Sequence, residues 1–206
     1  MPLPALAVGG AGAVGQLSVT GLLTRVLGSV PISTGGYRKW GSSKQRGIRI
    51  DTEIDNYVAY GTTPKLKESL AILARLQREG VSLISTQERY ERVVEGQLLV
   101  GKVDGVGITR KGERVIVEIK SGFRRSRCRS KALPSYLLSS KTINDNQRTR
   151  ALLQLSTYCG LSSTEKGLLL IANEGGECSA CWLRSSLEGV PHLEVVRRLV
   201  RNCPPS

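Results

Sequence analysis

The chain has 206 residues and a hydrophobic fraction of 40%, which suffices for a folded core and excludes a fully disordered protein. No apolar run reaches the roughly 20 residues that a membrane-spanning helix needs, so we expect no membrane span. The 30 lysines and arginines outnumber 17 aspartates and glutamates, giving a net charge of +13 that attracts polyanions. Charge alone names no partner, because a basic protein need not meet nucleic acid.

Histidine and cysteine chemistries have little support in this sequence. The single histidine, His192, has no partner motif nearby, which argues against a histidine-rich metal site or a Ser-His-Asp triad. Among the 5 cysteines only Cys178 and Cys181 form a C-x-x-C pair, and a zinc or iron–sulfur site would need more ligands. We therefore interpret His192 as structural and the cysteines as free thiols.

The first half of the chain predicts helices after a short lead. Small residues over 1–14 indicate a flexible lead, followed by a single domain over 15–206. Apolar residues at helical spacing predict three helices, Gln16–Leu27, Gly47–Tyr60 and Lys65–Glu79. Ser18 or Thr20 is expected to cap the first, and Gly80 to end the third. The third is amphipathic, with a predicted apolar face of Leu66, Leu70, Leu73 and Ala74.

After Gly80 the apolar spacing changes to alternation, which predicts strands. The first four expected strands are Val81–Ile84, Arg89–Val94, Leu98–Ile108 and Glu113–Ile119. A helix over Asp145–Tyr158, strands over Gly167–Ala172 and Cys178–Leu183, and a final helix or strand over Glu194–Val200 complete the chain. Helices, a strand meander, another helix and further strands predict an α/β fold with a mixed central β-sheet flanked by helices.

Three polar residues on two of these strands predict a catalytic centre. Glu118 and Lys120 are separated by one residue, so strand alternation points both side chains to one face. A turn at Lys111-Gly112 can bring Asp104 beside them. Two carboxylates there would bind a hard cation such as Mg²⁺ or Mn²⁺, which polarises a phosphodiester and activates water. Lys120 could orient that water or stabilise developing negative charge. An ordinary Glu–Lys pair explains E-x-K alone, but not the placement of Asp104.

These residues resemble the D…(D/E)-x-K motif of PD-(D/E)XK nucleases. More narrowly, they are similar to the RecB-type exonuclease branch, which includes the mitochondrial genome maintenance exonuclease and phage-type recombination exonucleases. Gln154–Tyr158 fits its Q-x-x-x-Y motif, and Ser18–Leu23 fits an S-V-T-x-φ-L entry segment, φ being apolar. Gly47–Asp55 fits a G-x-x-φ-H-x-x-φ-(E/D) helix pattern, except that Asp51 stands where histidine is usual.

The resemblance implies a restriction-endonuclease-like core and a DNA exonuclease that depends on Mg²⁺ or Mn²⁺. The catalytic residues would be Asp104, Glu118 and Lys120. The metal-binding residues would be Asp104, Glu118, Ile119 and Asp51. Glu53 is the second choice for the role of Asp51, and the two point to different sides of the helix. Glu88 is either a further site residue or a solvent-facing strand residue.

The resemblance also implies DNA as the partner, single-stranded or as an end-containing duplex. Gln154 and Tyr158 lie one helical turn apart and would help to hold the substrate or Lys120. Basic side chains expected to contact phosphates are Arg124, Arg125 and Arg148. The loop with the first two could instead be a nuclear-import patch or a solvated loop. A partner protein from recombination or replication would suit this activity, and nuclear, mitochondrial, viral and bacterial settings all fit.

Two other functions compete with a DNA exonuclease in repair, recombination or replication. An endonuclease of the same fold would use the same three residues, but the Q-x-x-x-Y match argues against it. A basic nucleic-acid-binding module without catalysis would not need the set of Asp104, Glu118 and Lys120. RNA stays open as a substrate, because nothing in the sequence reads a 2′-hydroxyl.

Overall fold

The computed structural model describes residues 15–28, 40–123, 147–187 and 189–204, so the predicted lead lies outside the described residues. The helices are α1 (Val19–Leu27), α2 (Trp40–Tyr60), α3 (Lys67–Glu79), α5 (Gln147–Ser162) and α6 (His192–Arg201). The strands are β1 (Gln16–Ser18), β2 (Val81–Thr86), β3 (Arg89–Val94), β4 (Gln97–Lys102), β5 (Gly105–Thr109), β6 (Arg114–Phe123), β7 (Lys166–Asn173), β8 (Cys178–Arg184), β9 (Ser186–Leu187) and β10 (Val190–Pro191). None of the helices is long and apolar enough over its described residues to cross a membrane.

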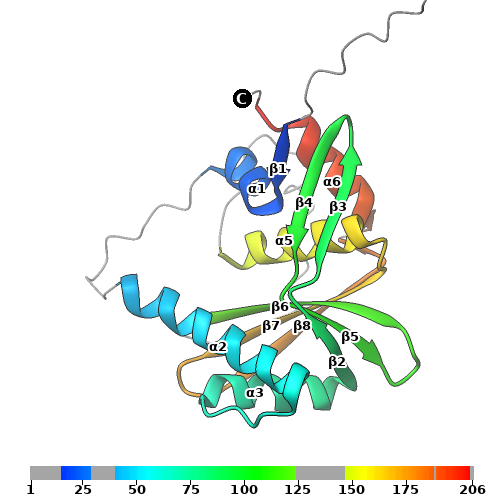
Figure 1. Cartoon of the computed structure of the whole chain (residues 1–206). Helices are drawn as coiled ribbons and strands as arrows, with labels where there is room; N and C mark the ends of the chain where they lie inside the picture. The colour runs from blue at the N-terminus through cyan, green and yellow to red at the C-terminus, as the bar shows by residue number, and fades with distance from the viewer. Residues whose placement is uncertain (1–14, 29–39, 124–146, 188, 205–206) are drawn as a thin grey trace, which may run out of the picture.

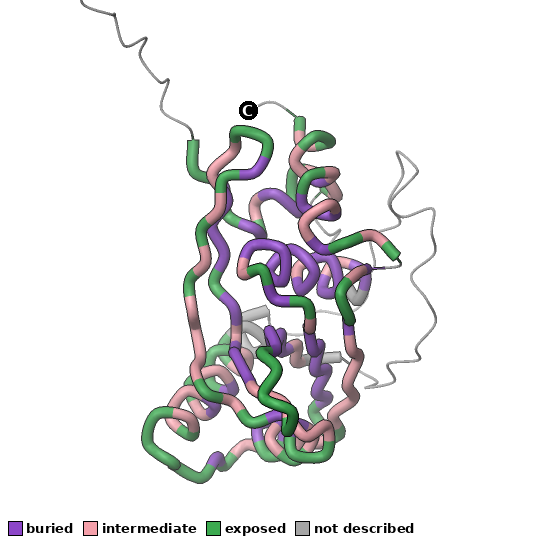
Figure 2. Tube along the Cα trace, turned by 90° about the vertical axis from the view of Figure 1, so that its right-hand side faces the viewer, coloured by how far each residue is buried: buried purple, intermediate pink, exposed green. Residues whose placement is uncertain are grey.

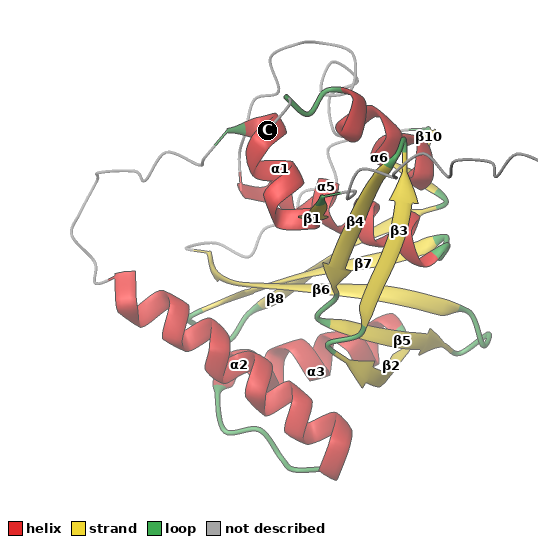
Figure 3. Ribbon diagram, turned by 45° about the horizontal axis from the view of Figure 1, so that its top comes forward, coloured by secondary structure: helices red, strands yellow, loops and turns green. Residues whose placement is uncertain are grey.

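The described residues form two mixed sheets flanked by helices, which confirms the predicted α/β class (Figure 1). The larger sheet has seven strands in the order β10-β9-β8-β7-β6-β5-β2, and the smaller one has the order β1-β4-β3. The pairs β6–β7 and β1–β4 are parallel, and the other strand pairs are antiparallel. Helices α2 and α3 cover one face of the larger sheet, and α5 lies on the other (Figures 1 and 3).

Strand β6 separates two hydrophobic cores. Its side chains Val115, Val117 and Ile119 pack into the core with α2 and α3, beside Ile54. Ile116 packs into the other core, which α1, α5 and α6 share with β4. Figure 2 shows the buried parts of α5 and the central strands. Because side chains alternate along a strand, Glu118 and Lys120 share the face of Ile116, toward α5.

The segment predicted as one helix over Gln16–Leu27 divides into a strand and a helix. Its first three residues form β1, which pairs in parallel with β4. Ser18 then caps α1, since its side chain accepts the Gly21 N–H at 3.0 Å. A short strand that ends in a cap lacks the length at which alternation can be recognised, which is why its apolar residues were assigned to the helix.

The single strand predicted over Leu98–Ile108 is wrong, because it divides between the two sheets. Strand β4 ends at Lys102, and β5 begins at Gly105 in the larger sheet. At the junction the Val103 N–H donates to the Glu88 carbonyl at 3.0 Å. Beyond it the chain crosses from the smaller sheet into the larger one (Figure 3). Asp104 therefore lies where the two sheets meet.

The predicted apolar face of α3 is right for two of its residues and wrong for the other two. Leu66 and Leu73 are half-buried and pack against the core with α2. Leu70 is 44% exposed and Ala74 is exposed, whereas Glu68, Ser69, Ile72 and Leu76 are buried. Glu68 can be buried because Arg46 of α2 donates to its carboxylate from Nε at 2.5 Å. The buried face of α3 therefore includes a charged residue that apolar spacing does not indicate.

His192 and the two cysteines of the C-x-x-C pair pack into the fold without forming a metal-binding cluster among the described residues. His192 is buried, with Nδ1 at 2.8 Å from Ser156 Oγ and Nε2 at 3.2 Å from the Glu165 carbonyl. Cys178 and Cys181 lie on β8 and pack against different cores, so they face opposite sides of the sheet. Two thiols on opposite faces cannot jointly hold one metal ion.

Gly101 permits the close approach of β4 and α5, which gives a stability prediction. A Cβ at Gly101 would lie 2.6 Å from Cε1 of buried Tyr158 and 3.0 Å from Cγ2 of Val19. We expect Gly101→Ala to lower the free energy of unfolding by about 1–3 kcal/mol through overpacking, measured by urea denaturation. Gly47→Ala in α2 is the matched control, since the nearest described atom outside the helix to its added Cβ would be Ser121 Oγ, at 3.9 Å. That change should be neutral or stabilising, and equal effects would contradict the packing argument.

Candidate active site

Glu118 and Lys120 lie side by side on β6, at the face that α5 covers. The Glu118 side chain is 1% exposed, whereas that of Lys120 is 31% exposed, so only the lysine reaches solvent. Lys120 Nζ forms an ion pair with Glu118 Oε1. Glu118 Oε2 is buried and has no hydrogen-bond partner among the described residues. One carboxylate oxygen is therefore left to bind a further cation or donor.

Asp104 joins this pair from the junction of the two sheets. Its Oδ2 accepts the Ile119 N–H at 2.7 Å, just beyond the last β5–β6 pair, Gly105 with Val117. The N–H and C=O of one strand residue point toward the same neighbouring strand. The Ile119 carbonyl thus faces the side on which Asp104 lies, beyond the end of the ladder. The hairpin brings the side chains of Asp104, Glu118 and Lys120 together, and their catalytic roles stay predictions.

The electrostatics of these carboxylates indicate a site short of positive charge. Burial, followed by the charge of Asp104, raises the pKa of Glu118 to about 8, although Lys120 opposes this shift. Burial also raises the pKa of Asp104 against the effects of Lys120 and the Ile119 N–H. Burial lowers the pKa of Lys120, but Glu118 and Asp104 outweigh it and the net shift is upward. One lysine does not neutralise the carboxylates around it.

The alternatives Asp51 and Glu53 differ in the direction their side chains take from α2. Ile50 and Ile54 are fully buried, and Asp51, which follows Ile50 on α2, is half-buried. Burial and then the charge of Asp104 raise the pKa of Asp51 to about 6, with Lys120 opposing them. Glu53 Oε2 instead accepts the Leu66 N–H at 3.0 Å, before the first turn of α3.

Asp55, one helical turn after Asp51, is a site neighbour to which sequence reasoning gave no role. Its Oδ1 is buried without a hydrogen-bond partner among the described residues, and its charge raises the pKa values of both Asp51 and Asp104. The signal was available in the helix pattern, since Asp55 fills the acidic position at its end. Its i, i+4 spacing from Asp51 puts both on one helical face.

Gln154 and Tyr158 of α5 lie on the helix that faces β6. Gln154 Nε2 donates to Tyr158 Oη at 2.9 Å, so the two polar groups of Q-x-x-x-Y act as one unit. Burial and the charge of Glu118 raise the pKa of Tyr158 well above its usual value, so its hydroxyl stays protonated. The hydroxyl can thus donate a hydrogen bond near the carboxylates. Its role in holding substrate or Lys120 stays a prediction.

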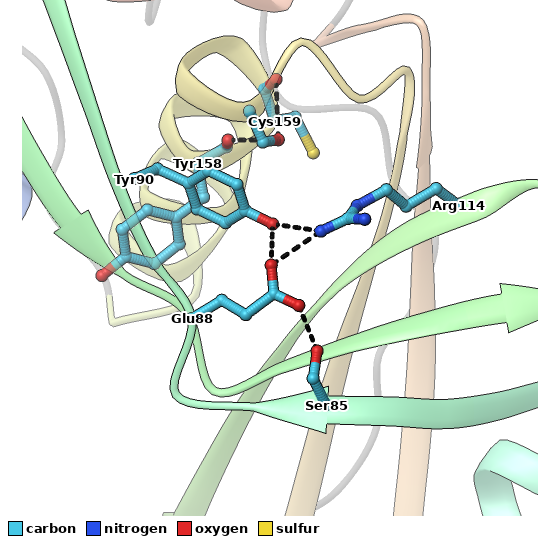
Figure 4. Close-up of polar contacts among 7 residues, drawn as sticks. Ser85, Glu88, Tyr90, Arg114, Tyr158 and Cys159 are labelled. Carbon is cyan, nitrogen blue, oxygen red and sulfur yellow. Dashed lines mark hydrogen bonds and ion pairs between the residues drawn. The ribbon is translucent and has the colours of Figure 1, made fainter.

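Glu88 lies in a hydrogen-bond network of its own (Figure 4). Its Oε2 accepts from Tyr90 Oη at 2.6 Å and from Arg114 at 2.7 Å, and its Oε1 accepts from Ser85 Oγ. Burial raises its pKa, but these donors outweigh burial and the net shift is downward. The network connects Tyr90 of β3 with Arg114 at the start of β6. Glu118 lies farther along β6.

The three basic residues predicted to contact phosphates are placed only in part. Arg124 and Arg125 fall outside the described residues, and Arg148 belongs to the first turn of α5. Their proposed contacts with DNA stay predictions.

The residues fit a hard divalent cation by their donor chemistry. Asp104, Glu118 and Asp51 offer carboxylate oxygens, and Ile119 offers a carbonyl, which are the donors that Mg²⁺ and Mn²⁺ prefer. The buried, unpartnered Oε2 of Glu118 is the oxygen most in need of a cation. Within the described ranges, no three His, Cys, Asp or Glu side chains converge closely enough to hold an ion. Lys120 binds one Glu118 oxygen and the Ile119 amide holds Asp104.

The two α2 acids give a matched pair of predictions. We expect Asp51→Ala to weaken Mn²⁺ binding roughly tenfold or more, measured by isothermal titration, because it removes a carboxylate near Asp104. Glu53→Ala should leave Mn²⁺ affinity unchanged and lower the free energy of unfolding by about 1–2 kcal/mol, since Leu66 loses its acceptor. Exchanged results for the two variants would reverse this assignment.

The chain resembles two solved exonuclease structures at low sequence identity. A phage-related exonuclease from Haemophilus somnus 129PT has 11% identity and a TM-score of 0.43, over 91% of this chain and 92% of that one. An alkaline exonuclease from Laribacter hongkongensis has 10% identity and a TM-score of 0.44, over 92% and 86%. No family model matches the sequence, and no curated protein is similar to it in sequence. We therefore infer the function from the side chains of the site.

Proposed function

We propose that this protein is a metal-dependent deoxyribonuclease that hydrolyses phosphodiester bonds. The observation that carries the proposal is the buried carboxylate of Glu118, with Lys120 on one oxygen and no donor from the described residues on the other. A buried carboxylate of this kind is costly unless it is paired. Asp104 is half-buried and its charge acts on Glu118, so a second cation, bound between the two carboxylates, would explain the arrangement.

The proposed site would hold Mg²⁺ or Mn²⁺ through Asp104, Glu118, the Ile119 carbonyl and Asp51. When bound, such a cation would polarise the scissile phosphodiester and lower the pKa of a bound water. Lys120, which reaches solvent and keeps its proton, would bind a non-bridging phosphate oxygen and stabilise the charge that develops there. Tyr158, protonated and hydrogen-bonded to Gln154, would donate to the phosphate or to the leaving strand.

Exonuclease action on DNA is the finer part of the proposal. It rests on the Q-x-x-x-Y match at Gln154–Tyr158 and on the order of the motifs along the chain. The net charge of +13 suits a polyanionic substrate. Repair, recombination or replication are the processes in which such an activity would serve.

The deciding experiment compares wild type with Lys120→Ala on labelled DNA. Single strands and duplexes labelled at the 5′ or 3′ end, together with closed circles, are incubated with Mg²⁺, Mn²⁺ or EDTA. Lys65→Ala, which removes an exposed lysine before α3, is the matched control. We expect metal-dependent loss of linear DNA by wild type and the control, none by Lys120→Ala, and intact circles.

Each other outcome has a defined meaning. Cleavage of circles would make the protein an endonuclease. DNA binding without cleavage in any metal would reject the nuclease proposal and leave a nucleic-acid-binding module. Equal cleavage by Lys120→Ala would remove Lys120 from the reaction.

A further inference from the structure

A cationic pocket lies at the end of the larger sheet remote from Glu118. Its volume is about 360 Å³, and it is formed by the end of α3, the β5–β6 turn, the start of β7 and the end of β8. Five basic residues line it, Arg78, Arg110, Lys111, Lys166 and Arg184. On β6, Glu118 lies four positions after Arg114, which is near this turn, and four steps along a strand span about 13 Å. The pocket is therefore separate from the candidate active site.

The two acids of the pocket already have partners, so its positive charge is not cancelled. Glu79 accepts Trp182 Nε1 at 2.7 Å and lies 2.6 Å from Arg75. Glu113 pairs with Lys166. Arg78, Arg110 and Arg184 are exposed, and none of them forms an ion pair with a described residue. Several unpaired cations converge on one cavity.

The chemistry of the lining points to phosphate on a nucleotide. One arginine guanidinium group can bind two phosphate oxygens at once through two parallel N–H donors. A lysine ammonium group lacks this planar geometry and binds phosphate as a point charge. Trp182 lines the same cavity, and an indole ring offers a stacking surface for a base. A volume of about 360 Å³ falls in the range of pockets for small ligands.

We propose that this pocket is a second nucleotide-phosphate site, distinct from the catalytic one. Its ligand is a nucleotide unit, either within a nucleic-acid strand or free. We assign the phosphate to Arg110, from the β5–β6 turn, and to Arg184, from β8, because both line the pocket. Binding at this site does not require that the chain cleave DNA, so it can be tested whether or not the nuclease proposal holds.

The first test measures binding of a labelled single-stranded oligonucleotide in EDTA by fluorescence anisotropy. Arg110→Ala/Arg184→Ala is compared with Arg197→Ala/Arg201→Ala, a matched loss of two charges on α6, where both arginines contact Glu95. We expect the pocket variant to bind roughly tenfold more weakly and to lower the salt slope by about 1.4, at 0.7 per cation. Equal weakening by the two variants would overturn the proposal.

The second test separates the two sources of the nucleotide. Trp40→Phe leaves Trp182 as the single tryptophan of a chain that has 2, so its emission reports on the pocket. A change on titration with a deoxynucleoside 5′-monophosphate, absent with Arg110→Ala/Arg184→Ala, assigns the pocket to free nucleotides. A change with the oligonucleotide alone assigns it to a strand. Constant emission with both ligands would reject the site.

Discussion

Glu118→Gln is expected to slow DNA cleavage roughly 10²–10³-fold and at the same time to make the metal-free protein more resistant to heat. The loss of activity follows because a neutral amide holds a divalent cation more weakly than a carboxylate does. The gain in stability follows from burial, which raises the pKa of Glu118 from 4.5 to about 8. Glutamine has the same shape and no charge to bury.

The pH dependence of that gain has a definite sign. Between about pH 4.5 and 8 the folded protein keeps a proton on Glu118 that the unfolded chain has lost. Stability of the wild type therefore falls as pH rises through this window, and the fall is complete above the folded pKa. Glu118→Gln lacks this contribution, so the difference in melting temperature should grow from pH 5 to pH 8.

Thermal unfolding in EDTA at several pH values measures the effect. One kcal/mol corresponds to roughly 2–4 °C in a protein of this size, so a shift of several degrees at pH 8 is expected. Glu91→Gln, which changes an exposed glutamate on β3, is the control and should alter neither activity nor melting temperature. A Glu118→Gln protein less stable than wild type at pH 8 would mean that the carboxylate is stabilised by its neighbours.

Mn²⁺ or Mg²⁺ should raise the melting temperature of the wild type, and more at pH 8 than at pH 6. At one hundred times Kd, a ligand that binds only the folded state adds about 2.7 kcal/mol, equivalent to roughly 5–10 °C here. The carboxylates must lose their protons to bind the ion. Asp51, with a pKa of about 6, and Glu118, with a pKa of about 8, do so as pH rises across this range.

Differential scanning fluorimetry with matched ionic strength tests this expectation. Glu118→Gln should show no shift with either cation, because it removes the buried oxygen to which the described part of the chain gives no other partner. A shift of the same size in that variant would place the ion elsewhere on the protein. A wild-type shift that is independent of pH would show that the bound carboxylates are already ionised.

The sequence could predict the pairing of Glu118 with Lys120 because strand alternation and a short turn are local properties. The same reasoning put Asp104 beside them, since only the hairpin at Lys111-Gly112 separates the two strands. The choice between Asp51 and Glu53 could not be made in this way. It depends on which side of α2 packs against the sheet, and buried Ile50 decides that only once the helix is docked.

The errors in the fold have a common physical origin in tertiary partners. The segment Leu98–Ile108 was interpreted as one strand, yet it changes sheets between Lys102, where β4 ends, and Gly105, where β5 begins. On α3, Leu70 was predicted to be buried and is exposed, while Glu68 is buried and paired with Arg46 from another helix. Periodicity records what a segment can bury, and it carries no information about which segment will be its neighbour.

The placement of β6 between two cores restricts how this chain can change in length. Side chains of β6 alternate between the core with α2 and the face of α5, so their order is tied to position along the strand. Inserting or deleting one residue between Val115 and Lys120 would exchange the two faces of the segment after it. The valines and isoleucines could be replaced by other apolar residues of similar volume. The number of residues between Val115 and Glu118 could not change, because Glu118 and Lys120 would then point into the apolar core with α2 and α3.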